Sequence, residues 1–211
     1  MIENAAVLPE TVAQKLRTDI VTQVQAPGSA ITESAVAVRF NVARPTARIA
    51  IERLVADGLL RREPHRAARV PILSTTDIVD LFANRAIVEG AAIASLTENG
   101  TIPADALRAH RSLRAGSTDF AHDDIQFHRA LVAGQPSSRL TRMHELLMGE
   151  IELCIGQVQS AQLLTSAEIA EQHQGILDAV TAGDAATAKR LTRDHIVGAR
   201  DRLLTHLDST N

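Results

Sequence analysis

The chain has 211 residues, of which 45% are hydrophobic, so it has enough apolar material for packed cores and is not a disordered chain. Aromatic residues are limited to four Phe, which argues against single-stranded nucleic-acid binding because that function needs aromatic stacking platforms. The single Cys154 excludes a disulfide framework and a cysteine-rich zinc site. No apolar run reaches the length of a membrane span and no signal-peptide pattern is present, so we expect a soluble, cytoplasmic protein.

Charge is divided unevenly along the chain. Residues 1–73 carry ten Lys and Arg against seven Asp and Glu, whereas residues 74–211 carry twelve against eighteen. Eight of the arginines fall within residues 39–69. A basic segment joined to an acidic remainder favours a protein in which only the first part meets a polyanion. An ordinary solvated charged surface is the alternative that charge alone leaves open.

Residues 1–73 show three helical patterns followed by two short strand patterns. Apolar residues at helical spacing predict the first helix, and Pro27-Gly28 ends it. Thr32 is a helix-start residue, and Pro45 suits the first turn of a third helix that stops at Gly58. The expected elements are helices over about 8–25, 32–42 and 44–58, and strands over 59–62 and 68–72. This order is typical of a winged helix-turn-helix DNA-binding domain with a small β-hairpin wing.

Residues 74–211 show only helical periodicity, so the fold class is mainly α. Ser74 to Asp77 is a helix-start signal and a natural domain boundary. Six helices with short loops between them predict an all-α bundle. We expect them at about 76–97, 103–115, 118–133, 136–160, 165–182 and 184–207.

The third helix of the first domain carries residues suited to DNA. Arg44 and Arg48 are four residues apart and share one helix face, and Thr46 lies at the same end. A recognition helix presents such side chains to base edges and phosphates from its N-terminal turns. The expected wing adds three more cations: Arg62, Arg66 and Arg69.

Residues 8–72 resemble the DNA-binding domain of GntR-type regulators. The resemblance rests on Pro27-Gly28, on Val42-Ala43-Arg44 and on the block from Arg53 to Leu60. It implies that Arg44, Thr46 and Arg48 contact double-stranded DNA. We also expect Arg66 of the wing to contact DNA. The wing departs from the family pattern because residues 61–70 contain no Gly, and a wing tip without Gly cannot approach the minor groove as closely.

A second group of residues suits a metal ion. Asp124 and His128 are four apart on one helix face, and His173 and His195 lie on two later helices. Three histidines and one carboxylate can converge in a bundle and bind Zn²⁺ or Ni²⁺. Taken singly, an interior histidine is more often a hydrogen-bonded residue of the core than a metal ligand.

Residues 76–207 resemble the FCD effector domain found in the FadR and VanR branches of the GntR regulators. The matching signature is Asp124, His128, His173 and His195, and the resemblance implies that these residues bind a divalent metal ion, with Zn²⁺ or Ni²⁺ expected, beside a small carboxylate effector. It also implies that Arg85 pairs with the effector's carboxylate, although Arg85 and Glu89 are spaced to satisfy each other instead. Six helices favour the VanR-like branch. We expect the remaining histidines to be surface or packing residues: His65, His110, His122, His144 and His206.

The sequence therefore predicts a homodimeric, ligand-responsive transcription regulator, with a repressor expected, that binds an operator through residues 1–73. Residues 74–211 would bind the metal and the effector and form the dimer. Effector binding would repack the bundle and alter the separation of the two recognition helices. Two alternatives are a metal-dependent hydrolase and an architectural DNA-binding protein without an effector. A general base beside the ligands would favour the hydrolase, and none is evident in the sequence.

Overall fold

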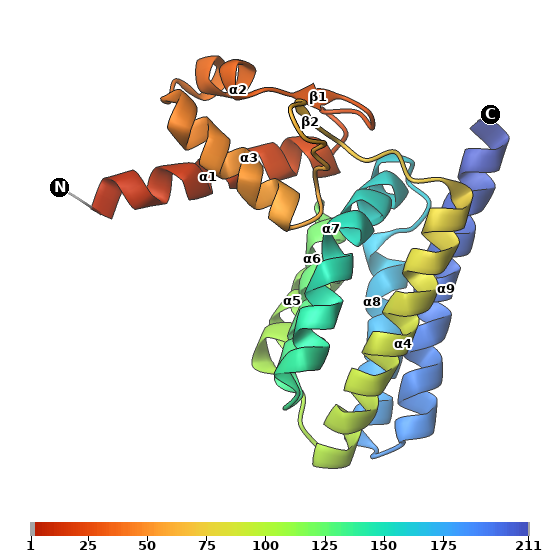
Figure 1. Cartoon of the computed structure of the whole chain (residues 1–211). Coiled ribbons are helices and arrows are strands. Elements are labelled where there is room, and N and C mark those ends of the chain that lie inside the picture. Colours follow the sequence, from red (N-terminus) through yellow and green to blue (C-terminus); the bar gives the residue numbers. More distant parts are fainter. Residues whose placement is uncertain (1–2, 211) are drawn as a thin grey trace. The chain divides into compact units, whose positions relative to one another are not determined.

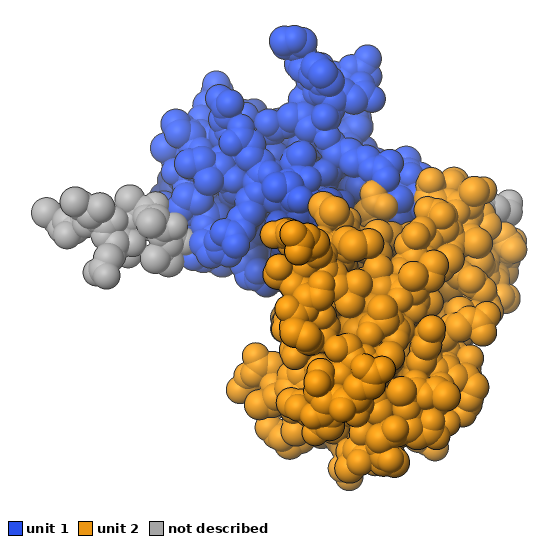
Figure 2. All heavy atoms as spheres, turned by 60° about the horizontal axis from the view of Figure 1, so that its bottom comes forward, with its two compact units in different colours: residues 1–73 blue, residues 74–211 orange. Residues whose placement is uncertain are grey.

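The computed structural model describes residues 3–210, with side chains described for residues 8–209. The chain divides into two compact units, one ending at Leu73 and one beginning at Ser74. Figure 2 colours the two units separately. No helix in the described range is long and apolar enough to cross a membrane.

The first unit is a small helical domain with a short sheet. Its core is made by apolar residues from the first and third helices, among them Leu16, Ile20, Ile51 and Leu54, all buried. Its elements, in chain order, are α1 (Glu3–Val21), β1 (Ala30–Ile31), α2 (Glu33–Phe40), α3 (Arg44–Ala56) and β2 (Ala68–Arg69). Figure 1 shows them in red to orange.

Local capping sets the helix-turn-helix. The Thr32 hydroxyl accepts a hydrogen bond from the backbone N–H of Ala35 and so begins α2 as predicted. Asn41 adopts a left-handed conformation with φ 51° and ends the same helix. Pro45 lies in the first turn of α3, where its missing N–H costs nothing. These three features fix the turn that leads into α3.

The wing differs in detail from the predicted hairpin of residues 59–62 and 68–72. The regular pairing is between β1 and β2, which run antiparallel with Ala30 opposite Arg69 and Ile31 opposite Ala68. The predicted first strand contributes only a single bridge, from Arg61 to Arg69. Leu59 and Leu60, just before it, are buried in the core, so burial rather than strand pairing accounts for their apolar character.

The first helix is also shorter at its C-terminal end than the periodicity predicts. It ends at Val21 rather than near Gln25. Gln23 has a positive φ of 61°, a backbone conformation that cannot continue an α-helix.

The second unit is a bundle of six helices within the described residues, as predicted. They are α4 (Thr75–Asn99), α5 (Ala104–Arg114), α6 (Phe120–Gly134), α7 (Ser138–Ser160), α8 (Ser166–Thr181) and α9 (Ala185–Thr210). Side chain and backbone cap each other reciprocally at Ser74–Asp77 and at Thr165–Glu168, so α4 and α8 begin where the sequence signals place them. The long helices α4 and α9 pack side by side (Figure 1).

The core of the bundle has an apolar part and, next to it, a part that contains buried polar side chains. One buried cluster combines aliphatic residues of several helices with Phe127, which is fully buried. Next to Phe127 lie His128 and His173, also fully buried. Buried histidines and carboxylates are costly unless they are paired or bind a ligand, so this level of the bundle is where a site is to be sought.

Candidate metal centre

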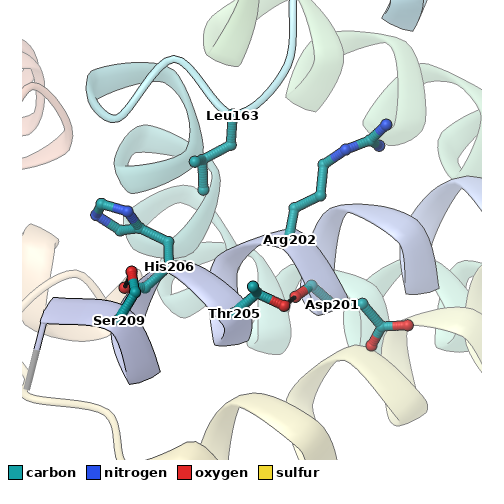
Figure 3. Close-up of a pocket in the computed structure, with 6 residues that line it drawn as sticks. All are labelled: Leu163, Asp201, Arg202, Thr205, His206 and Ser209. Carbon is teal, nitrogen blue, oxygen red and sulfur yellow. Dashed lines mark hydrogen bonds between the residues drawn. The ribbon is translucent and has the colours of Figure 1, made fainter.

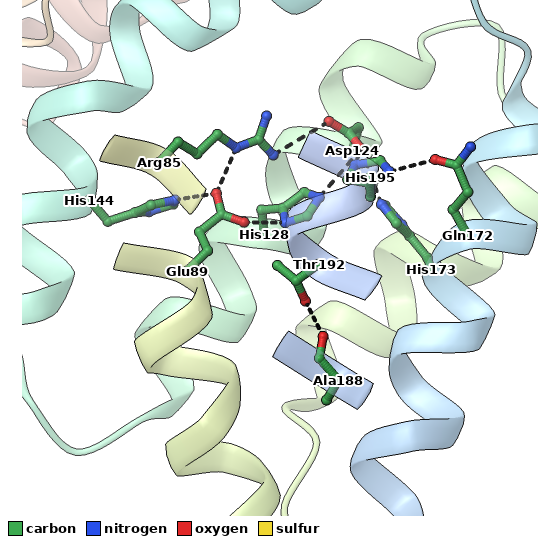
Figure 4. A network of polar contacts seen from close by, with 10 residues as sticks. All are labelled: Arg85, Glu89, Asp124, His128, His144, Gln172, His173, Ala188, Thr192 and His195. Carbon is green, nitrogen blue, oxygen red and sulfur yellow. Dashed lines mark hydrogen bonds and ion pairs between the residues drawn. The ribbon is translucent and has the colours of Figure 1, made fainter. Parts of the chain in front are cut away.

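Four polar side chains from three helices converge inside the bundle. Asp124 and His128 come from α6, His173 from α8 and His195 from α9 (Figure 4). One ligand atom from each of the four lies within 4.8 Å of the others, and all four residues are buried. The Nε2 atoms of His128, His173 and His195 lie 3.6, 3.1 and 3.2 Å from Asp124 Oδ1. The structure thus brings together the four residues that the sequence predicts as ligands.

The convergent atoms are left without ordinary partners. Asp124 Oδ1 and the Nε2 atoms of His128 and His173 are buried and have no hydrogen-bond partner among the described residues. Such atoms normally find a partner, and a divalent cation supplies one for all of them at once. One carboxylate oxygen and three imidazole nitrogens suit a borderline ion such as Zn²⁺ or Ni²⁺. The residues present therefore fit a bound divalent metal.

Two of the three histidines have a polar side chain beside Nδ1, whereas the His173 ring is held by stacking and its Nδ1 has no hydrogen-bond partner among the described residues. His195 Nδ1 lies 2.7 Å from the side-chain oxygen of Gln172, and His128 Nδ1 lies 2.6 Å from Glu89 Oε2. The ring of His173 stacks on that of Phe127, with centroids 3.8 Å apart and an interplanar angle of 11°. These contacts fix the ring orientations that point the Nε2 atoms toward Asp124.

The electrostatics of the cluster favour neutral imidazoles at His173 and His195 beside the ionised carboxylate of Asp124. Burial lowers the pKa of His195 and, more strongly, that of His173. Burial would raise the pKa of Asp124, but the three adjacent histidines hold it well below its usual range. His128 differs: burial would lower its pKa, yet the neighbouring Glu89 raises it. A charged oxygen and neutral imidazoles are the forms in which these groups bind metals.

Arg85 lies next to the cluster and is fully buried. Its Nε donates to Glu89 Oε1 at 2.7 Å, which is the intrahelical pair that the spacing allowed. Both terminal nitrogens of Arg85 are buried without a hydrogen-bond partner, and Nη2 lies 3.9 Å from Asp124 Oδ2. The pair with Glu89 therefore leaves the outer edge of the guanidinium available for an anion.

The sequence indicates Glu89 only as a partner of Arg85, and it assigns His144 no place in this network. The Nε2 atom of His144, on α7, lies 3.0 Å from Glu89 Oε1, and its side chain is buried (Figure 4). The prediction that His144 is a surface or packing residue is therefore incomplete. No local pattern marks His144, because its partner lies 55 positions away in the chain.

Comparison with known proteins agrees with this architecture. The FCD domain pattern matches residues 80–198, more than half of the chain, and the pattern of the bacterial regulatory proteins of the gntR family matches residues 8–70. The chain belongs to the GntR family and carries an FCD domain. The family is one of transcription regulators rather than enzymes.

Curated relatives span nearly the whole chain. A "Probable D-xylose utilization operon transcriptional repressor" of Paenarthrobacter nicotinovorans is 29% identical over 88% of this chain and 86% of its own length. The HTH-type transcriptional repressor GlaR of Escherichia coli is 27% identical over 86% of this chain and 89% of its own. A solved structure from Rhodococcus sp. RHA1 covers 93% of this chain and 97% of its own at a TM-score of 0.77 and 23% identity, which shows that the fold is shared.

The GntR domain presents its expected DNA-binding residues at the surface. Arg44, Arg48 and Arg66 are exposed and Thr46 is half-buried. Arg48 pairs with Glu52, and Arg66 lies 3.0 Å from Glu63. Arg69, the other predicted wing cation at the end of this segment, donates a hydrogen bond to the backbone oxygen of Gly28. Arg44, Thr46 and Arg48 lie in the first two turns of α3, as a recognition helix requires.

The FCD domain also has an open pocket of about 490 Å³ beside the C-terminal part of α9 (Figure 3). It is lined by Leu163, Asp201, Arg202, Thr205, His206 and Ser209. All these side chains are exposed or half-buried, so water solvates them well without a ligand. We assign this pocket no function.

Proposed function

We propose that this chain is a homodimeric transcription repressor whose GntR domain binds an operator and whose FCD domain binds a divalent metal and a small carboxylate effector. The domains would be residues 1–73 and 74–211. The observation that carries the proposal is the buried convergence of Asp124, His128, His173 and His195 beside the unpaired guanidinium edge of Arg85. As an operator-binding protein it would act in the bacterial cytoplasm. The repressor assignment is drawn from the names of the curated relatives.

The metal would be held by the carboxylate of Asp124 and by Nε2 of the three histidines. Zn²⁺ and Ni²⁺ are the candidates that match this donor set. Such an ion would polarise an oxygen ligand brought next to it. The chain's own contribution is to hold three imidazoles and one carboxylate in place in a buried interior.

The charge of the buried network supports a carboxylate effector. Once an ion is bound, the three imidazoles are neutral because each gives a lone pair to the ion. The carboxylates of Asp124 and Glu89 then outnumber the single guanidinium of Arg85. A divalent ion turns this excess of one negative charge into an excess of one positive charge, and a single carboxylate would then neutralise it. Arg85 suits this role because guanidinium and carboxylate geometries match.

DNA binding would use Arg44, Thr46 and Arg48 of α3, with Arg66 of the wing beside them. Their exposure and their place in the first turns of α3 support this assignment. Arg contacts to guanine edges discriminate between bases, and contacts to phosphates set the register.

A second copy of the chain is expected because one recognition helix reads too few base pairs for a specific operator. Large apolar side chains remain exposed on neighbouring helices α4 and α7, with Ile87 at 69% and Leu146 at 77%. The exposed acid Asp80 on α4 and the exposed Arg142 on α7 add complementary charge. We infer that these faces meet their counterparts in the dimer.

The effector response would be a shift between two bundle packings. Binding between the metal centre and Arg85 would favour one packing and alter the separation of the two recognition helices. A coupling free energy of about 1–3 kcal/mol is enough for a useful switch.

The test starts from a DNA duplex selected from a random pool by the purified protein at moderate salt. Fluorescence anisotropy then measures operator affinity with a panel of small carboxylates, for the unaltered protein and for Asp124→Ala and Arg85→Ala. We expect one carboxylate class to change the affinity and both substitutions to abolish that change. An unaltered response in both variants would refute the effector site, and failure to select any duplex would refute operator binding.

The dimer is tested separately by sedimentation velocity of Ile87→Glu and Leu146→Glu. Both substitutions should produce monomers that bind the selected duplex weakly. An exposed change away from these faces, Arg108→Glu, is the matched control and should leave the dimer intact. If all three variants sediment as dimers, the second copy docks elsewhere.

A further inference from the structure

Glu89 occupies a place between the proposed metal centre and the proposed effector residue. It lies one turn after Arg85 on α4 and is buried. Its Oε2 is 2.6 Å from Nδ1 of His128, whereas Nε2 of the same ring is the atom that faces Asp124. Glu89 therefore contacts the far side of the His128 ring and is not among the four convergent residues.

We propose that Glu89 is a positioning residue that orients His128 for metal binding and, through its other oxygen, holds Arg85 ready for the effector. The proposal rests on the metal site of the proposed function. A neutral imidazole carries one N–H, so a carboxylate that accepts the Nδ1 proton leaves the Nε2 lone pair directed at the ion. A carboxylate behind a histidine ligand also raises the basicity of that ligand.

The second oxygen of Glu89 is committed to different partners. Oε1 accepts from Arg85 Nε at 2.7 Å and lies 3.0 Å from His144 Nε2. Arg85 is held at its inner edge by this contact. Its two terminal nitrogens have no hydrogen-bond partner among the described residues, and Nη2 lies 3.9 Å from Asp124 Oδ2. One carboxylate thus touches a proposed metal ligand with one oxygen and the proposed effector-binding guanidinium with the other.

A simpler role for Glu89 would be to neutralise the buried charge of Arg85. That role predicts a loss of stability when Glu89 is altered but no loss of metal affinity. A positioning role predicts a weaker metal site even in the folded protein. The two roles therefore differ in a quantity that can be measured directly.

The experiment is a zinc competition titration of the purified protein against a chromophoric chelator. We expect Glu89→Gln to lower zinc affinity about 10- to 100-fold, the range found when such supporting partners are removed. His144→Leu is the matched control, because it removes another buried contact of Glu89 without touching His128; its zinc affinity should stay close to that of the unaltered protein. Circular dichroism and thermal unfolding in excess chelator report folding and stability separately from metal binding.

A second measurement covers the case in which Glu89→Gln does not fold. In the zinc-loaded unaltered protein, long-range ¹H–¹⁵N spectra should show an exchange-protected Nδ1 proton on His128 hydrogen-bonded to a carboxylate. Zinc affinity unchanged by Glu89→Gln, or an Nδ1 of His128 that carries no protected proton, would overturn the assignment of Glu89 while leaving the metal site standing. If the unaltered protein binds no zinc, the metal site of the proposed function fails and the role of Glu89 fails with it.

Discussion

The Nε atom of Arg48 lies 2.7 Å from a carboxylate oxygen of Glu52, one helical turn further along α3. The pair is exposed, with 63% of the Arg48 side chain and 47% of the Glu52 side chain accessible. Glu52 raises the pKa of Arg48, so the guanidinium is charged at every physiological pH. Water and salt compete with an exposed pair of this kind, so Arg48 can exchange Glu52 for DNA at little cost.

Arg48→Ala should therefore weaken binding to the selected operator. We expect operator affinity to fall roughly 5- to 150-fold if Arg48 contacts a guanine. If Arg48 contacts a phosphate instead, the slope of log affinity against log salt concentration should become smaller by about one. Glu52→Gln is the matched variant. It breaks the ion pair that holds Arg48 and removes a negative charge near the DNA phosphates, so operator affinity should rise. Anisotropy titrations at several salt concentrations measure both effects. Equal operator affinity of the unaltered protein and both variants would show that Arg48 does not contact the DNA.

Metal removal should lower the stability of the FCD domain. A ligand that binds only the folded state stabilises it by about 2.7 kcal/mol at a hundred times its dissociation constant. We expect dialysis against a chelator to lower the unfolding temperature and added zinc to restore it. Asp124→Ala should make the unfolding temperature insensitive to zinc. Identical melting curves of the unaltered protein with chelator and with zinc would refute stabilisation by a bound metal.

The single thiol should be inert in the native protein. Cys154 is buried in α7, and burial raises its pKa to about 12. The thiolate is the reactive form, and with so high a pKa almost none is present at pH 7–8. A chromogenic disulfide reagent should therefore fail to modify the folded protein and should titrate one thiol after unfolding in guanidinium. Rapid reaction of the folded protein would show that this part of α7 opens to solvent.

Gly134 should be intolerant of any side chain. A Cβ built on Gly134 would lie 2.3 Å from Cγ of Pro103, a ring that cannot rotate away. We expect Gly134→Ala to destabilise the protein by about 1–3 kcal/mol, the usual cost of overpacking.

At Gly198, in α9, an added Cβ would meet nothing nearer than 3.9 Å. Gly198→Ala should be neutral or stabilising by up to about 1 kcal/mol, because Ala is the better helix former. Urea unfolding of both variants checks the contrast, which is refuted if the two lose stability equally.

Most helix positions were predictable because helix signals are local. The Thr32 cap, the Ser74–Asp77 box and Pro45 act within one turn of the chain, and all three begin helices as expected. The wing was less predictable. Its regular pairing joins residues 30–31 to residues 68–69, and no pattern near residue 68 reveals a strand partner nearly forty positions away.

The four candidate metal ligands could be predicted from the sequence, but the side chains that contact and orient them could not. The spacing of Asp124 and His128 places them on one helix face, and resemblance to the FCD domain pointed to His173 and His195. The spacing of Arg85 and Glu89 allowed their pair, but the contact of Glu89 with His128 and the contacts of Gln172 and His144 were missed, because no local pattern marks them. Each touches its partner across the bundle, at a distance that only packing sets.

The sequence by itself determined the order of helices, the basic first segment and the candidate ligand residues. These depend on periodicity, charge and side-chain chemistry. Only the tertiary structure decided that one oxygen of Asp124 meets three imidazole nitrogens and that Glu89 stands between His128 and Arg85. The reason is that side-chain convergence depends on how helices far apart in the chain rotate and pack against one another, and that arrangement is chosen by burial of the whole core rather than by any local stretch.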